Sequence, residues 1–232
     1  MKDKRNSGEK FAVLYEAGKK CCLILDHLYS EIELTARQAS DPATVEADPL
    51  VVPKLNIAAL GLIDYLHRFH EIVTAMPLLT KDMSEVKDFG AALKSVHACR
   101  NYLQHMGGRL KSDSKINYPI LGAFSWIHEN RNYMLFLNQK STLFSAPGIA
   151  YDRATDTYVC KYQLVVGGTE VQLDTAFHEV KKFWAWLDKS CEITPPEIKS
   201  YSWGKPNIVH SQIVQASHRL ARPPEDADGV RS

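Results

Sequence analysis

The chain has 232 residues, of which 45% are hydrophobic and 24% charged, an ordinary composition for a folded protein. The formal net charge of +1 argues against an extended basic surface for nucleic acid, but it is compatible with a short RNA contact at one site. No apolar run approaches the roughly 18 residues that a membrane span needs, and the charged start is not followed by a signal-peptide core. We therefore expect a cytoplasmic protein that does not enter a membrane.

The cysteines favour neither a disulfide framework nor a structural zinc site, because their number is odd and no C-x-x-C pair occurs. Burial as small hydrophobic side chains is the expected role, and no cofactor is expected. The five residues are Cys21, Cys22, Cys99, Cys160 and Cys191.

The first half of the chain predicts three long helices, because apolar residues recur at steps of three and four. The first is expected over 8–38, where Asp41-Pro42 follows and disfavours helix. The second is expected from Pro53 to the residue before Pro77. The third is expected to start near Asp82 and to end at Gly107-Gly108, since glycine commonly follows a helix C-terminus.

The next part of the chain is rich in aromatic and branched residues, which predicts strands. A hairpin is expected from 121–127 and 133–137, with 128–132 as its turn. A second strand pair is expected from 158–166 and 169–173, around the two-residue turn Gly167-Gly168. Asp174 is a candidate N-cap for a fourth helix that Thr194-Pro195-Pro196 ends.

These elements predict a mainly α fold, in which four helices form an antiparallel bundle and a β-hairpin-rich insertion precedes the last helix. The expected domain organisation is one helical domain over 1–192, with the insertion at about 118–173. Residues 193–232 combine Pro223-Pro224 with mixed charge and no clear periodicity, so a poorly ordered C-terminal tail is expected there.

Arg100 stands out because it falls where the stripe of the third helix calls for another apolar residue. That stripe consists of Val86, Phe89, Leu93 and Val96. A charged side chain on a buried seam costs several kcal/mol unless it is paired. A second row, His97, Asn101 and His105, lies beside it at intervals of four, so its members share one helix face. Arg100 and His105 are about 140° apart around an ideal helix.

The segment Arg100-Asn101-Tyr102-Leu103-Gln104-His105 resembles the motif of the HEPN superfamily: an arginine, a polar residue that is often asparagine, variable residues, and a histidine. Its position near the end of a long helix in a predicted bundle is the context that this family would supply. The resemblance covers about residues 8–107 and the helix over 175–192. It implies a HEPN-like bundle and a homodimer in which two copies of the motif face a shared cleft.

By this resemblance the chain would be a metal-independent endoribonuclease of a bacterial defence or toxin–antitoxin system, with an antitoxin or activator protein as a further partner. His105 would act as general acid or base, Arg100 would neutralise phosphate charge, and Asn101 would orient the phosphate. The chemistry agrees, since histidine titrates near neutral pH and a guanidinium matches phosphate oxygens. Cleavage would leave a 2′,3′-cyclic phosphate.

Four further residues near the motif are candidates for RNA contact: His97, Tyr102, Arg109 and Lys111. Two alternatives remain open. The motif could serve structure alone, in a non-catalytic HEPN-like module for dimerisation or ligand sensing. More remotely, Asp64, His67 and His70 could hold a metal together with His97 or His105.

Overall fold

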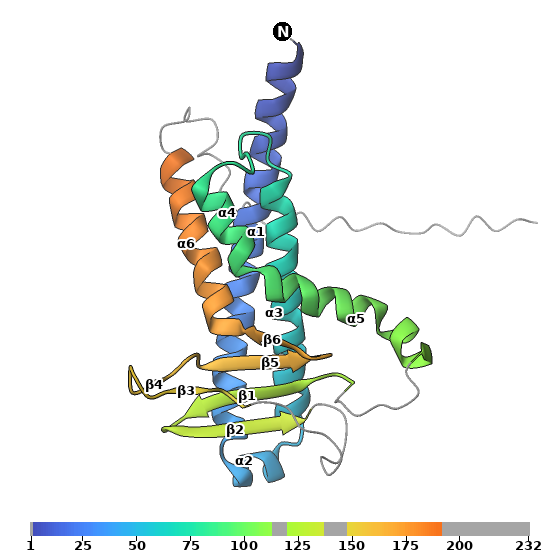
Figure 1. The fold of residues 1–232 in the computed structure, drawn as a ribbon, viewed down its shortest axis with the longest axis vertical. Helices are drawn as coiled ribbons and strands as arrows, with labels where there is room; N and C mark the ends of the chain where they lie inside the picture. The colour runs from blue at the N-terminus through green and yellow to red at the C-terminus, as the bar shows by residue number, and fades with distance from the viewer. Residues whose placement is uncertain (1, 113–119, 137–147, 192–232) are drawn as a thin grey trace, which may run out of the picture.

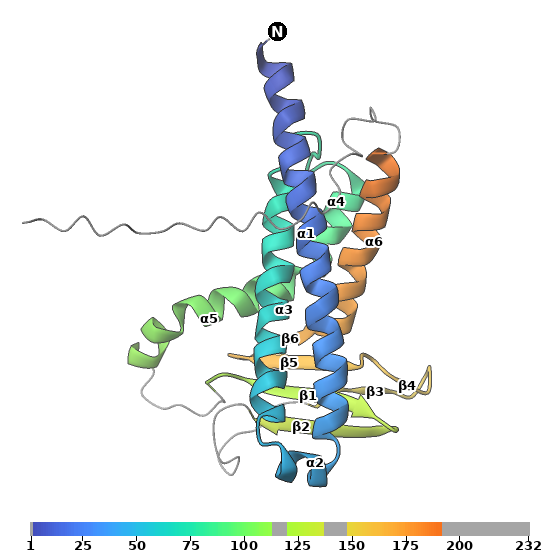
Figure 2. The same ribbon diagram turned by 180° about the vertical axis from the view of Figure 1, so that it is seen from behind.

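Two long antiparallel helices organise the chain in the computed structural model, which describes residues 2–112, 120–136 and 148–191 (Figures 1 and 2). They are α1 (Lys2–Ala39) and α3 (Val51–Thr74), and the short α2 (Pro42–Ala47) joins them. The expected helix stop at Asp41-Pro42 is confirmed. Asp41 then caps α2, because its carboxylate accepts hydrogen bonds from the backbone N–H groups of Ala43 and Thr44.

Both long helices bury one apolar stripe, as their residue spacing predicts. In α1 the buried positions include Phe11, Cys22, Leu25 and Ile32. In α3 the buried positions include Leu55, Leu62, Leu66, Phe69 and Val73. The cysteines at 21, 22, 99 and 160 are buried free thiols, which confirms their role as small hydrophobes for these four positions.

The expected third helix is two helices, so the prediction of one continuous element was wrong. They are α4 (Ser84–Ala92) and α5 (Lys94–Ser112). Leu93 lies between them, with φ −94° and ψ 7°, and is fully buried. The break lets α4 pack along the bundle while α5 turns sideways, away from the bundle axis (Figure 1).

The expected end of the third helix at Gly107-Gly108 was also wrong, because α5 continues to Ser112. Neither glycine has a positive φ. Glycine weakens a helix by roughly 1 kcal/mol relative to alanine but does not forbid it, so a Gly-Gly pair is a tendency rather than a stop. The motif therefore lies well inside α5, and the helix does not unwind just after His105.

The β segments form an antiparallel four-stranded sheet with the order β2-β1-β5-β6, and a separate two-stranded ribbon, β3-β4. The bounds are β1 (Ala123–His128), β2 (Arg131–Phe136), β3 (Tyr151–Asp152), β4 (Thr157–Tyr158), β5 (Tyr162–Val166) and β6 (Thr169–Gln172). The first hairpin turns at Glu129-Asn130, both with positive φ, so its turn is shorter than expected. The expected strand from Tyr158 to Val166 is divided, since Tyr158 belongs to the ribbon and the sheet strand begins at Tyr162.

The predicted turn at Gly167-Gly168 is confirmed, with φ values of +55° and +79°. Gly167 also lies directly against α5. A Cβ at Gly167 would meet the ring of Tyr102 at 2.2 Å, whereas a Cβ at Gly168 would meet nothing within 4 Å. Gly167 therefore lets the hairpin approach the helix that carries the motif.

We expect Gly167→Ala to lower the free energy of unfolding by about 3 kcal/mol, since it combines a left-handed backbone with overpacking against Tyr102. Gly168→Ala has the strained backbone without the clash, so it should lower the free energy of unfolding by only about 1 kcal/mol. Urea denaturation of the two variants measures the difference. Equal losses would show that the Tyr102 contact does not constrain the turn.

The last helix, α6 (Leu173–Cys191), begins directly after β6. Asp174 lies in its first turn instead of at the N-cap, and its carboxylate accepts hydrogen bonds from the backbone N–H groups of Lys161 and Tyr162. It thus ties the start of α6 to the start of β5. The predicted helix stop at Thr194-Pro195-Pro196 and the expected tail fall within residues 192–232, which are outside the described part of the chain.

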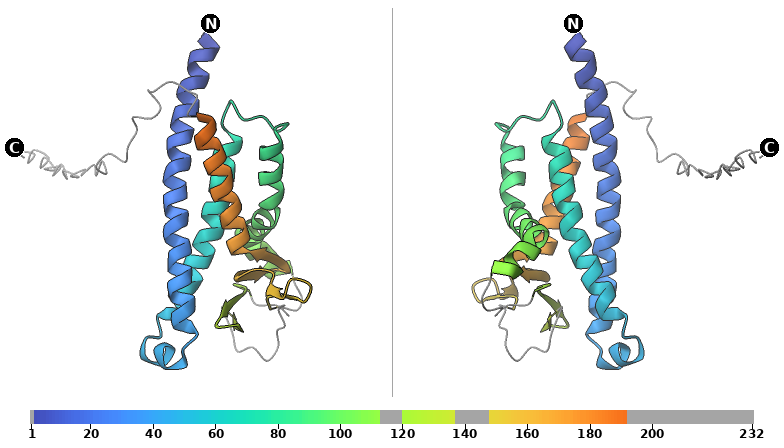
Figure 3. Two further views of the ribbon diagram at one scale, coloured as in Figure 1. Left: turned by 90° about the vertical axis from the view of Figure 1, so that its left-hand side faces the viewer. Right: turned by 90° about the vertical axis from the view of Figure 1, so that its right-hand side faces the viewer.

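The fold is mainly α with a small antiparallel sheet, as expected from the sequence. The sheet lies across one end of the α1–α3 pair (Figure 3) and shares its core, because Phe124, Tyr162 and Leu164 belong to the same buried cluster as Leu66 and Phe69. The β-rich insertion is therefore an integral layer of the fold. Among the described residues, no helix combines the length and the apolar character that a bilayer span requires.

Candidate functional site

Polar side chains follow one face of α3 where α5 crosses it. Asp64, His67 and Glu71 are three and four residues apart, which is the spacing of a single helix face, and Arg68 borders this face four residues after Asp64. On α5, His97 and Arg100 lie three residues apart and contact this face. The crossing of α3 and α5 thus contains a mixed cluster of carboxylates, imidazoles and guanidiniums.

Asp64 pairs with two arginines at once. One carboxylate oxygen, Oδ2, accepts a hydrogen bond from Nε of Arg68 at 2.6 Å, and the other, Oδ1, lies 3.4 Å from Nε of Arg100. The Arg68 side chain is 58% exposed, whereas that of Arg100 is only 20% exposed. Arg100 therefore has the ion pair that a charge on this seam requires, and the carboxylate does not depend on Arg100 alone.

The buried seam of α5 runs beside Arg100 and not through it. Cys99 and Tyr102 are the buried residues of this turn, at 0% and 4% exposure. The buried stripe continues from Val96 to Cys99 and Tyr102 at steps of three, whereas the sequence reading took the step of four from Val96 to Arg100. Arg100 lies at the edge of the seam, where its guanidinium reaches the polar face of α3.

Three histidines meet next to this ion pair. Nδ1 of His67 lies 2.7 Å from Nδ1 of His97, so one ring donates a hydrogen bond to the other. The ring of His70 lies 4.2 Å from that of His97, centroid to centroid. Nε2 of His97 and Nδ1 of His70 are buried and have no hydrogen-bond partner within the described residues.

Their surroundings keep these imidazoles neutral. Burial, together with the neighbouring His70 and His67, lowers the pKa of His97 to about 4. Burial also lowers the pKa of His67, with the positive charge of Arg100 as the next cause, and burial lowers that of His70. A neutral imidazole retains a free ring-nitrogen lone pair, which a proton acceptor or a metal ligand needs.

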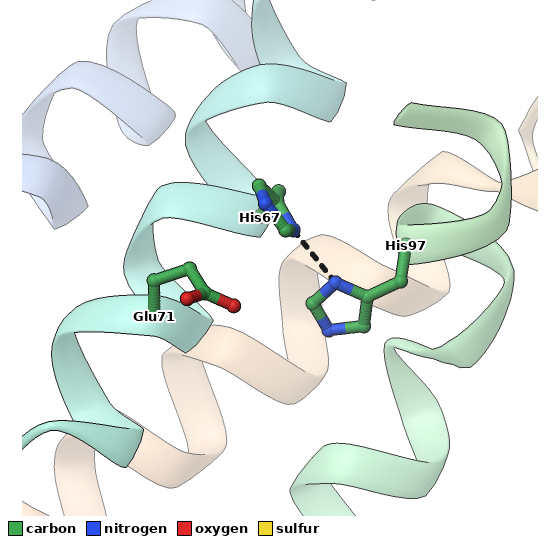
Figure 4. A group of neighbouring side chains, drawn as sticks. All are labelled: His67, Glu71 and His97. Carbon is green, nitrogen blue, oxygen red and sulfur yellow. Dashed lines mark hydrogen bonds between the residues drawn. The ribbon is translucent and has the colours of Figure 1, made fainter. Parts of the chain in front are cut away.

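Glu71 forms a candidate metal-binding group with two of these histidines. One ligand atom each from His67, Glu71 and His97 lies within 4.8 Å of the others (Figure 4). Of the three, His67 and Glu71 come from successive turns of α3, and His97 comes from α5. Sequence reasoning named both histidines as remote metal candidates but paired them with Asp64, His70 or His105, and it missed Glu71. The sequence does contain a signal for Glu71, because His67 and Glu71 are four residues apart and therefore share one face of the predicted helix.

The remaining motif residues lie on the outer part of α5. Asn101 and His105 are exposed and share one helix face, one turn apart, and Lys111 is exposed near the helix end. Arg109 belongs to α5, but its side chain is outside the described part of the chain. Arg100 instead contacts α3, so within one chain Arg100 and His105 have separate surroundings.

Tyr102, a candidate RNA contact, is buried against Gly167 at the sheet. From that position its ring cannot stack on a base that approaches from solvent. Its place in the motif is explained by packing, because it anchors α5 to the β5–β6 turn. The RNA contact predicted for Tyr102 does not fit this buried position.

Comparisons with known proteins identify no relative, since no family model, no curated protein and no solved structure matches the chain.

Proposed function

We propose that the chain is a metal-independent endoribonuclease of the HEPN type, in which Arg100, Asn101 and His105 act on the RNA backbone. The observation that carries the proposal is the surface of α5. It presents an exposed imidazole and an exposed amide one turn apart, and the same helix carries a guanidinium that a carboxylate of α3 already orients. An oriented cation and a solvent-accessible proton carrier are what phosphoryl chemistry without a metal requires.

The proposed active site forms between two copies of the chain. Arg100 contacts α3 of its own chain while His105 is exposed, so a second copy is needed to bring a guanidinium and the two His105 imidazoles to the same phosphate. The outer half of α5 suits such contact, because it projects from the bundle (Figure 1) and presents the partly exposed Leu103, Met106 and Leu110 beside the motif. A homodimer packed along α5 would cover this apolar strip and create a shared RNA cleft.

In the proposed reaction the ribose 2′-OH attacks the adjacent phosphorus. The 2′-oxygen gives its proton to one His105, the new O–P bond forms, and the bond to the 5′-oxygen breaks as that oxygen takes a proton from the second His105. Arg100 neutralises charge on the pentacoordinate phosphorus, and Asn101 orients a phosphate oxygen. The products are a 2′,3′-cyclic phosphate end and a 5′-OH end.

The proposed biological role is cytoplasmic RNA cleavage in a bacterial defence or toxin–antitoxin system, under the control of an antitoxin or activator protein. Lys111, and Arg109 by its place in the sequence, would add contacts to neighbouring phosphates. His97 would support Arg100 from within the cluster rather than touch RNA.

The reaction chemistry provides the decisive test. We expect purified, untagged protein to cleave RNA in excess EDTA and to leave 2′,3′-cyclic phosphate ends, detected by end-specific ligation or mass spectrometry. An oligonucleotide with a 2′-deoxy sugar at each cut site should resist cleavage, since it lacks the attacking hydroxyl. Cleavage that requires a divalent cation, or that leaves other ends, would refute the mechanism.

One observation favours a second candidate, a non-catalytic HEPN-like module for dimerisation or ligand sensing. Arg100 is paired with Asp64 at 3.4 Å and bridges α3 and α5, which is also what a purely structural arginine would do. In that case the protein would dimerise without cleaving RNA. Substitution of Arg100 would then change stability or dimerisation and no activity.

A further inference from the structure

We propose that His67, Glu71 and His97 bind one borderline divalent transition-metal cation of the Zn²⁺ class at the crossing of α3 and α5 (Figure 4). This site is distinct from the exposed motif face of Asn101 and His105. It does not depend on the ribonuclease proposal, because that reaction needs no metal.

The donor set identifies the class of ion. Two imidazole nitrogens and one carboxylate oxygen are the ligands that Zn²⁺ takes in sites with one open position, whereas Mg²⁺ and Ca²⁺ prefer sites made of oxygen alone. Among the described residues, this is the one group of three or more histidine, cysteine or acidic side chains whose ligand atoms converge so closely.

The geometry needs only a small adjustment. The three ligand atoms lie within 4.8 Å of one another. A tetrahedral zinc ion requires ligand atoms about 3.4 Å apart, given bonds of about 2.0–2.1 Å. Glu71 can supply the movement, because its side chain is 63% exposed and therefore free to rotate toward the histidines. The two imidazoles are already in contact at 2.7 Å and would separate slightly around the ion.

An unpartnered polar atom gives a second, independent indication. Nε2 of His97 is buried without a hydrogen-bond partner in the described part of the chain, and so is Nδ1 of the adjacent His70. Buried polar atoms are rarely left unpaired, because a buried group without a hydrogen bond loses its contact with water and gains none in return. The hydrogen bonding of the histidine cluster is therefore incomplete within the described residues, as expected of a site that a further group completes.

The local charges allow a cation. Arg68 and Arg100 contribute two positive charges, and Asp64 and Glu71 contribute two negative ones, so the cluster is neutral while the histidines are neutral. Both guanidiniums are directed to Asp64, whereas Oε1 of Glu71 lies 3.8 Å from Nδ1 of His70, beyond hydrogen-bond distance, and would turn from His70 toward the ion. A bound ion would connect α3 to α5 one turn before Arg100 and so hold the motif helix against the bundle.

The test uses the full-length, untagged protein after removal of metals with a chelator. Zn²⁺ affinity is measured by competition with a chromophoric chelator, and Co²⁺ is added as a spectroscopic probe. We expect one equivalent of Zn²⁺ to bind, and the Co²⁺ complex to show the intense visible absorption of low-coordinate nitrogen and oxygen ligation.

Glu71→Gln is the critical variant, because Glu71 is exposed and its replacement should leave the fold intact. We expect Glu71→Gln and His67→Gln each to weaken Zn²⁺ binding by at least about 100-fold, since loss of even an outer-shell partner costs about 10–100-fold. The controls are Glu179→Gln on α6 and the exposed His27→Gln on α1, and both should bind Zn²⁺ like the wild type.

Two results would overturn the proposal. One is a folded wild-type protein that binds no Zn²⁺. The other is Zn²⁺ binding that Glu71→Gln leaves unchanged, which would assign the ion to histidines elsewhere, such as His210 or His218. Both outcomes are independent of ribonuclease activity, because no RNA is present and cleavage is assayed separately in EDTA.

Discussion

We expect His105→Ala to lower the rate of RNA cleavage by roughly 10²–10⁴-fold, the usual contribution of one positioned general acid or base. His105 is exposed on α5, so its removal leaves no cavity and should not alter the fold. The loss should therefore appear in the cleavage rate, while the circular dichroism spectrum and the unfolding midpoint stay at wild-type values. The measurement is the initial cleavage rate of a labelled RNA in EDTA.

Gln104→Ala is the matched control for this experiment. Gln104 is the exposed residue directly before His105, on the same helix turn. Its replacement should leave the rate nearly unchanged. Equal activity of wild type and His105→Ala would remove the imidazole from the mechanism and favour the non-catalytic module, whereas equal loss in both variants would point to a damaged α5.

Arg100→Ala should lower cleavage by about 10²–10³-fold, the range measured when one donor to developing charge is removed. Arg68→Ala is its matched control, since both guanidiniums pair with the carboxylate of Asp64 but only Arg100 belongs to the motif. We expect Arg68→Ala to retain most of the activity. Cleavage rates of the two variants, measured side by side in EDTA, separate catalysis from the ion pair.

Stability measurements complete this comparison. Arg100→Ala leaves Asp64 paired with Arg68, so no carboxylate is orphaned, and a partly exposed ion pair contributes about 1 kcal/mol or less. We therefore expect the free energy of unfolding of Arg100→Ala to fall only slightly. A large loss of stability together with unchanged cleavage would make Arg100 a structural clamp. Arg100→Lys should fall between wild type and alanine, because lysine keeps the charge and loses the planar fork.

Local patterns of the sequence predicted much of the fold. The steps of three and four in α1 placed Phe11 and Ile32 on the buried face, and Gly167-Gly168 formed the expected turn. The errors lie where a local tendency competes with packing. The predicted third helix is interrupted at Leu93, although the neighbouring residues favour a helix. The helix α5 continues through Gly107-Gly108, although glycine disfavours a helix.

The candidate site could be predicted only in part. Arg100, Asn101 and His105 were selected by their resemblance to the HEPN motif, and their role stays a prediction. Glu71 was not, because its role depends on which turn of α3 meets His97 on α5. Arg100 and His105 have separate surroundings for two reasons. The helix α5 is continuous through the motif, and Asp64 on α3 holds Arg100 against the bundle.

The helical stripes, the Gly167-Gly168 turn and the motif can be read from the sequence, since each depends on residues that are close along the chain. Three features follow only from packing in three dimensions: α5 crosses the polar face of α3, Tyr102 packs on Gly167, and the sheet shares the helical core. Residue spacing sets which face of an element a side chain occupies, whereas contacts between distant parts of the chain set which faces meet.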